Sequence, residues 1–183
     1  FILMLFLYFI VGLFTVINQQ FQVPLKSALL PHDGNMTNAL VTLLNFSWFL
    51  AYPFSEGFAT RWVDRLGYRK TSVYSLLIFI AGLGFYEAAV LLHIYAPSYI
   101  TIMGNPIFTG FFVFLSGSFV IGMAVTILQV VTGLYLDVNP VGKTTPLQRQ
   151  MIGGTTNSIG MAIGPLVVSY VIFYGIPLHN VQS

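Results

Sequence analysis

The chain has 183 residues, of which 56% are hydrophobic and only 7% are charged, and its mean hydropathy is +0.83. A soluble domain of this size could not bury so much apolar surface, so the composition indicates a protein that is embedded in a lipid bilayer. The net charge of +2 gives no sign of a nucleic-acid partner, and the absence of cysteine excludes disulfides and thiolate sites.

Five segments are long and apolar enough to cross a bilayer as helices of about 20 residues. A β-barrel would show alternating segments of about ten residues, whereas residues 73–92 are apolar on every side. We therefore predict an all-α, polytopic bundle with spans at about 1–22, 37–60, 71–92, 106–136 and 150–175.

The first predicted span ends in "NQQFQVP" (18–24), where Gln19, Gln20 and Gln22 lie close together. Amides at a helix end can mark a helix interface. They also supply hydrogen-bond donors and acceptors without charge, which is what a neutral polyol requires. On the second span, Asn45 shares one helical face with Asn38 and Thr42, so it is a further candidate for such a site.

Glu56 and Glu87 fall inside the second and third predicted spans. A carboxylate is costly in a bilayer, so each is a candidate for proton coupling. Two alternatives remain open. Glu56 can extend to the nearby interface, and Glu87 can stay protonated and neutral.

Six of the seven Lys and Arg residues lie in two short connections, at 61–70 and 137–149. The positive-inside rule places both connections in the cytoplasm, so the first helix runs from inside to outside.

The fourth predicted span contains Thr126, Gln129 and Thr132, three residues apart, which on a helix form a narrow polar stripe that must contact something. The fifth contains small residues at helical spacing around Asn157, for which we expect close helix packing, with Asn157 able to reach a cavity. The three histidines lack metal-ligand spacing, and no nucleophile has a base at usable spacing. We therefore expect no metal, no cofactor and no enzymatic activity.

The segment "RWVDRLGYRK" (61–70) resembles the signature between helices two and three of the major facilitator superfamily, G-x-x-x-D-R-x-G-R-[KR]. Asp64, Arg65, Gly67 and Arg69 match this pattern, whereas Thr60 stands where the first glycine would be. The resemblance implies that these residues latch the cytoplasmic side of a transporter shut in its outward-open state.

The segments "TILQVVTGLYLDV" (126–138) and "PLQRQMIGGTTNSIGMAIGP" (146–165) resemble helices four and five of the fucose, galactose and glucose proton symporters of that superfamily. Gly133 and Leu134 replace an Asn-Pro step of the family. Gln20 and Gln129 stand where fucose-type members have buried acids. The matching residues are Leu128, Gln129, Val130, Tyr135, Arg149, Asn157, Ser158, Gly160, Ile163 and Pro165.

The resemblance implies that residues 1–183 form the N-terminal half of a twelve-helix transporter, with five of its six helices present and the C-terminal half missing. Such a protein would move a neutral monosaccharide, a hexose or deoxyhexose, across the cell (inner) membrane by alternating access with proton coupling. Its partners would be the sugar, the lipid bilayer and its own C-terminal half. The expected sugar contacts are Gln19, Gln20, Gln22, Asn45, Gln129 and Asn157, and Glu87 and Glu56 are the expected proton carriers.

Three alternatives remain. "GMAIGP" (160–165) also resembles helix five of drug/proton antiporters. Because Gln20 and Gln129 cannot titrate, the proton could be carried in the C-terminal half, or the protein could be a facilitator or use another ion. A membrane-embedded enzyme or scaffold is the alternative outside transport.

Overall fold

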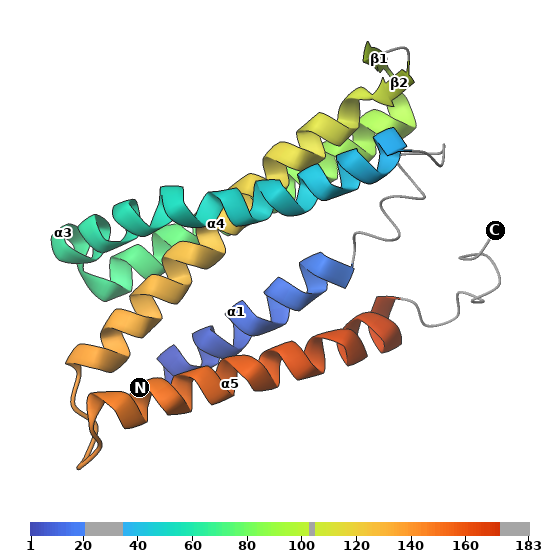
Figure 1. The fold of residues 1–183 in the computed structure, drawn as a ribbon. Helices are drawn as coiled ribbons and strands as arrows, with labels where there is room; N and C mark the ends of the chain where they lie inside the picture. Colours follow the sequence, from blue (N-terminus) through green and yellow to red (C-terminus); the bar gives the residue numbers. More distant parts are fainter. Residues whose placement is uncertain (21–34, 103–104, 173–183) are drawn as a thin grey trace. The chain divides into compact units, whose positions relative to one another are not determined.

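The computed structural model describes residues 1–20, 35–102 and 105–172, and most of these residues are helical. In chain order the elements are α1 (Ile2–Gln20), α3 (Asn35–Tyr95), β1 (Tyr99–Ile102), β2 (Asn105–Phe108), α4 (Thr109–Val138), α5 (Pro146–Val167) and the π-helical turn η1 (Val168–Ile172) (Figure 1). Among the described residues, α1, α3, α4 and the α5–η1 rod are long and apolar enough to cross a membrane. The predicted helical class is therefore confirmed, and these helices fit a membrane-embedded protein.

The five predicted spans appear as four helices because α3 contains two of them. Gly67 interrupts the 61 residues of α3 with φ 77° and ψ 166°, and the chain reverses direction there (Figure 1). Only glycine adopts this combination without strain. We call residues 35–66 the first arm of α3, residues 68–95 its second arm, and residues 61–70 the basic turn.

The described residues form two compact units. Unit 1 contains α1, the end of α4 from Thr132 onward, and α5. Unit 2 contains α3, the two strands and α4 as far as Val131. Each unit has its own packing.

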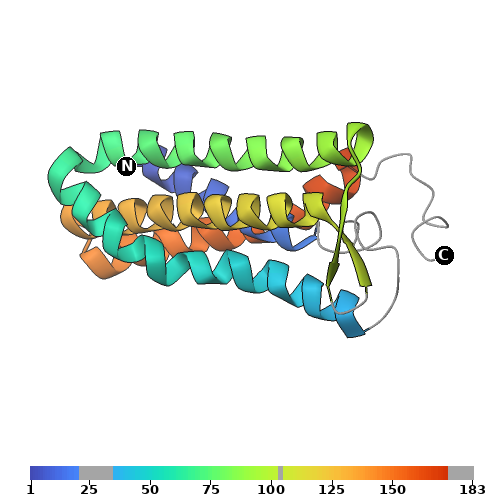
Figure 2. The same cartoon turned by 90° about the horizontal axis from the view of Figure 1, so that it is seen from above.

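In unit 2, α4 packs between the two arms of α3 (Figure 2). Ser47 on the first arm donates a hydrogen bond to the carbonyl of Leu115 (3.0 Å), and Ser75 on the second arm donates one to the carbonyl of Ala124 (2.6 Å). Gly122 allows close approach because an added Cβ would lie 2.8 Å from the carbonyl oxygen of Trp48. These contacts order α4 parallel to the first arm, so α4 runs toward the end of unit 2 that carries the basic turn.

A β-hairpin follows α3, and its second strand includes the first residues of the predicted fourth span. β1 and β2 pair in antiparallel fashion, with Tyr99 opposite Phe108 and Ile100 opposite Ile107. The strands contain Tyr, Ile and Phe, which favour extended structure. Ile107 and Phe108 are buried in a core cluster with Leu40, Leu44, Ala89, Phe111 and Phe114. The fourth helix therefore begins at Thr109 and not at residue 106.

In unit 1, α1 and α5 pack side by side in the same direction (Figure 1). An added Cβ at Gly160 would overlap the carbonyl oxygen of Phe9, and one at Gly164 would lie 3.2 Å from the Cβ of Val16. Gly153, Gly160 and Gly164 are all buried. The predicted small-residue seam on the fifth helix is thus confirmed, with α1 as the helix that it contacts.

Candidate functional site

The polar stripe on α4 points into the protein. Thr126 and Thr132 are buried, and the hydroxyl of Thr126 donates to the carbonyl of Gly122, one turn earlier in its own helix (2.8 Å). Gln129 lies between them in sequence, is half-buried and interacts with another group of the protein. An uncharged amide is thereby placed within a long apolar helix.

Asn157 joins two helices of unit 1. Its side-chain nitrogen donates to the carbonyl oxygen of Tyr8 (3.0 Å), which fixes α5 against α1 where Gly12 leaves room for its backbone. The structure therefore gives Asn157 a packing role. A contact with a substrate through its remaining oxygen stays a prediction.

The amides at the end of α1 do not gather around Asn157. Gln19 and Gln20 are exposed in the last turn of α1, whereas Asn157 packs at the level of Gly12. A rise of 1.5 Å per residue separates Gln20 from that level by about 12 Å along the helix. Gln22 lies outside the described residues.

Asn45 and Gln129 are also distant from each other within unit 2. Asn45 is half-buried on the first arm and interacts with another group of the protein. Gly122 on α4 packs against Trp48 and Ala51 on the first arm, and the two helices run parallel. Gln129 follows this contact by seven residues and Asn45 precedes it by at least three, so the two amides are about 15 Å apart along the helix axes. Neither unit alone therefore assembles the predicted amides into one compact cluster.

Both candidate proton carriers are exposed within helical arms of α3. Glu87 follows Tyr86, whose ring stacks on Phe114 (centroids 3.9 Å apart) and whose hydroxyl pairs with the Ser118 hydroxyl at 2.9 Å. Successive helical residues point about 100° apart, so Glu87 lies beside the face that contacts α4 and not on it. Glu56 is exposed on the first arm. In a bilayer, either carboxyl group would require a proton, a partner or access to water.

The residues that match the superfamily signature lie at the reversal of α3. Gly67 provides the non-helical residue, and Asp64, Arg65 and Arg69 are exposed on either side of it. The hydroxyls of Thr71 and Ser72 donate to the carbonyls of Gly67 and Tyr68, both at 2.9 Å, and so fix the start of the second arm. The basic turn is consequently a short, ordered corner.

Arg149 has a structural role that the sequence did not reveal. Its side chain is only 3% exposed, and it donates to three backbone carbonyls: Nε to Leu136 (2.5 Å), Nη1 to Thr144 (2.7 Å) and Nη2 to Asp137 (2.8 Å). Leu136 and Asp137 end α4, where carbonyls lack helical partners and the helix dipole favours a cation. Arg149 thus caps α4 from the first turn of α5.

Three neighbouring side chains complete this connection between α4 and α5. Gln150 donates to the carbonyl of Gly133 (2.8 Å) and to the carboxylate of Asp137 (2.9 Å). Thr145 and Gln148 form a capping box at the start of α5. The sequence signal for the capping box was the spacing "TPLQ" (145–148), whereas the side-chain cap from Arg149 has no fixed spacing that would identify it.

No family model matches the chain, and the comparisons with curated proteins and with solved structures find no match. Among the residues that the structure describes, no group of three His, Asp or Glu side chains could hold a metal ion. What the structure defines is a helical protein whose long apolar helices fit a membrane and contain buried hydroxyl groups and half-buried amides.

Proposed function

We propose that this chain belongs to a secondary transporter that moves a neutral monosaccharide across the cytoplasmic membrane by alternating access. The observation that carries the proposal is the half-buried Gln129, set between the buried Thr126 and Thr132 in α4. An amide in this position offers donors and acceptors to sugar hydroxyls without the cost of burying a charge. The sequence resemblance to proton-coupled sugar symporters supports the same substrate class.

The closely packed interfaces within each unit suit a mechanism in which bundles move as bodies. Glycine contacts hold α1 against α5, and serine hydrogen bonds hold α4 against both arms of α3. The ordered basic turn supports the latch that the superfamily signature implies, because a rigid corner can present Asp64 and Arg65 to an opposing helix end.

Uptake of labelled sugars into membrane vesicles tests the transport proposal. Vesicles from cells that express the complete protein should accumulate one or more neutral hexoses or deoxyhexoses, and an imposed proton gradient should increase the accumulation. A cationic drug serves as the contrasting solute. Proton-driven efflux of the drug without any sugar uptake would favour the antiporter alternative and contradict the proposal.

The coupling group is tested by Glu87→Gln in the same vesicles. Because an amide cannot titrate, we expect proton-driven accumulation to be lost while sugar exchange down its own gradient continues. Glu56→Gln tests the other candidate carrier, which is also an exposed carboxyl group on α3, and loss of accumulation in that variant alone would assign the coupling to Glu56. Accumulation by the Glu87 variant at the wild-type level would exclude Glu87 as the carrier.

A further inference from the structure

The basic turn concentrates positive charge on a corner of fixed shape. Arg61, Arg65, Arg69 and Lys70 are all exposed, and Asp64 is the single acid among them. Arg61 and Arg65 are four residues apart on one helical face of the first arm, while Arg69 and Lys70 begin the second arm. The helix is interrupted at Gly67 alone, so these four cations are held together without a flexible loop.

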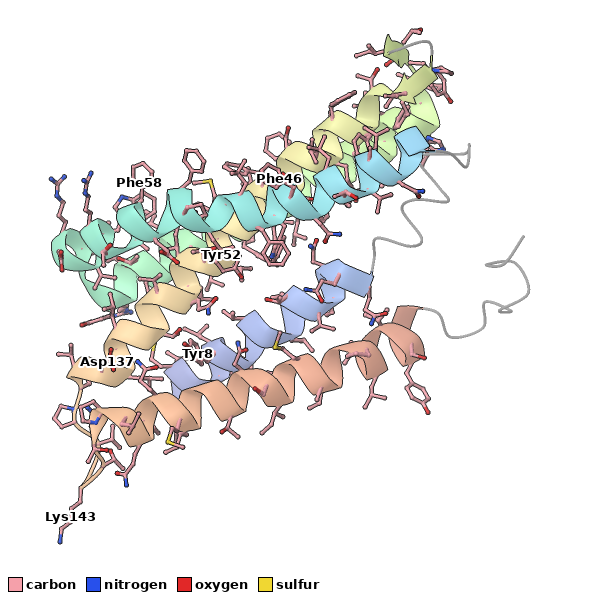
Figure 3. All side chains as sticks on the ribbon, viewed as in Figure 1. Tyr8, Phe46, Tyr52, Phe58, Asp137 and Lys143 are labelled. Atoms are coloured by element: carbon pink, nitrogen blue, oxygen red, sulfur yellow. The ribbon has the colours of Figure 1, made fainter. Side chains whose placement is uncertain are left out.

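Apolar and aromatic side chains adjoin the four cations. Trp62 and Tyr74 meet edge to face across the turn, with ring centroids 6.3 Å apart. Phe58, Leu66, Val73 and Leu77 are all exposed within about two helical turns of the cations. Figure 3 shows the Phe58 side chain projecting outward from the ribbon of α3. The corner therefore presents a cationic surface directly beside an exposed apolar one.

We propose that the basic turn binds the headgroup of an anionic phospholipid, with the acyl chains lying along the exposed apolar side chains of α3. Arginine forms paired hydrogen bonds with phosphate oxygens, and clustered Lys and Arg beside a membrane helix attract anionic lipids. Trp and Tyr favour the headgroup level of a bilayer, where this corner would lie. The adjoining apolar surface favours a lipid over a free phosphate ion. The proposal does not depend on which solute the protein moves.

Trp62 allows the site to be tested by fluorescence quenching. The purified chain is placed in phosphatidylcholine vesicles that contain a fixed fraction of phosphatidylglycerol, and the bromine quencher is carried on the chains of one lipid or the other. Trp48, the other of the two tryptophans, is buried and contributes the same background fluorescence in every sample. We expect brominated phosphatidylglycerol to quench more strongly than brominated phosphatidylcholine at equal mole fraction.

Amino-acid substitutions test whether the basic turn produces the preference for phosphatidylglycerol. Arg61→Gln with Arg65→Gln should lower the relative affinity for phosphatidylglycerol about fivefold for each cation removed. Lys143→Gln is the matched control. It removes one exposed cation from the α4–α5 connection, where the side chain extends away from the ribbon (Figure 3). Wild-type preference in the double Arg variant, or an equal loss in the Lys143 variant, would overturn the proposal.

Two further measurements use the wild-type protein alone, so they do not depend on whether a variant folds. Raising the salt concentration to 0.5 M should reduce the preference for phosphatidylglycerol, because exposed charges are screened. Inorganic phosphate at millimolar concentration should leave most of the quenching difference in place. If phosphate abolishes the difference, the corner binds a free anion and the proposed lipid site is wrong.

Discussion

Arg149 is a cation whose hydrogen bonds go to backbone carbonyls and not to an acid. Two carbonyls at the end of α4 and the carbonyl of Thr144 in the connection to α5 accept hydrogen bonds from its guanidinium group. The fork of the guanidinium group can reach several acceptors at once, which the single nitrogen of lysine cannot do. The residue therefore matters through its shape as well as its charge.

Replacement of Arg149 by alanine should destabilise the protein strongly. The change leaves carbonyls at the end of α4 without donors, and we expect a loss of about 3 kcal/mol in the free energy of unfolding. Arg149→Lys should recover only part of it. Unfolding in mixed detergent micelles, followed by circular dichroism, measures the difference. Lys143→Ala, in the same connection but exposed, should match the wild type, and an equally stable Arg149→Ala variant would show that the cap is not required.

Gln129→Ala tests the proposed sugar site at its half-buried amide on α4. Truncation should leave a sugar hydroxyl without a partner and weaken sugar affinity about tenfold. Competition between labelled and unlabelled sugar in vesicles of the complete protein measures this affinity. Thr155→Ala provides the control, because Thr155 is exposed on α5 and its hydroxyl bonds to its own helix at Met151. Unchanged affinity in the Gln129 variant would remove α4 from the proposed site.

At the scale of elements, the packing of α1 on α5 depends on glycine at particular positions. Gly160→Ala should place a methyl group against the backbone of Phe9 and destabilise the protein by about 1–3 kcal/mol. Gly154→Ala is the matched control on the same helix, because an added Cβ there would meet nothing within 4 Å. Because alanine has a higher helix propensity than glycine, the free energy of unfolding of the Gly154→Ala variant should equal that of the wild type or be slightly higher. Equal unfolding of the two variants in detergent would contradict the packing described for Gly160.

The helices could be predicted from sequence because runs of apolar residues about 20 long have few alternatives. The exact ends could not, and the hairpin at 99–108 was missed. "YITI" and "NPIF" are too short for their residue pattern to distinguish a strand from a loop. The burial of Ile107 and Phe108 depends on contacts with Leu40 and Leu44, which lie some 65 residues earlier in the sequence. Gly67 could be placed at a turn, but the absence of any loop around it could not be foreseen.

For the whole molecule, the absence of cysteine makes the predicted topology directly testable. Lys70, Ser98 and Lys143 are exposed, so single variants of each to cysteine should report their side of the membrane. We expect a membrane-impermeant maleimide to label positions 70 and 143 in inside-out vesicles and position 98 in intact cells. Labelling of positions 70 and 143 from opposite sides would contradict the positive-inside assignment.

The candidate site was less predictable than the fold. Residue type identified the half-buried Gln129, because an amide in an apolar helix requires a partner. Sequence could not separate an amide that faces a substrate from one that fastens two helices, since Asn157 uses the same chemistry to bind the carbonyl of Tyr8. That distinction depends on the close approach of α1 and α5, which Gly12 and Gly160 allow by leaving room for the backbone of the other helix.

The reversal at Gly67 also determines how the chain can change over evolution. Substitutions at the exposed positions of the basic turn alter its charge and leave the two arms in place. An inserted or deleted residue between Ser55 and Ser75 has no loop to absorb it, and it rotates one arm by about 100° relative to the other. Depending on which arm is displaced, Ser75 would turn away from the carbonyl of Ala124 or Ser55 would leave its buried position. The packing therefore constrains the length of this stretch more strongly than the residue types at its exposed positions.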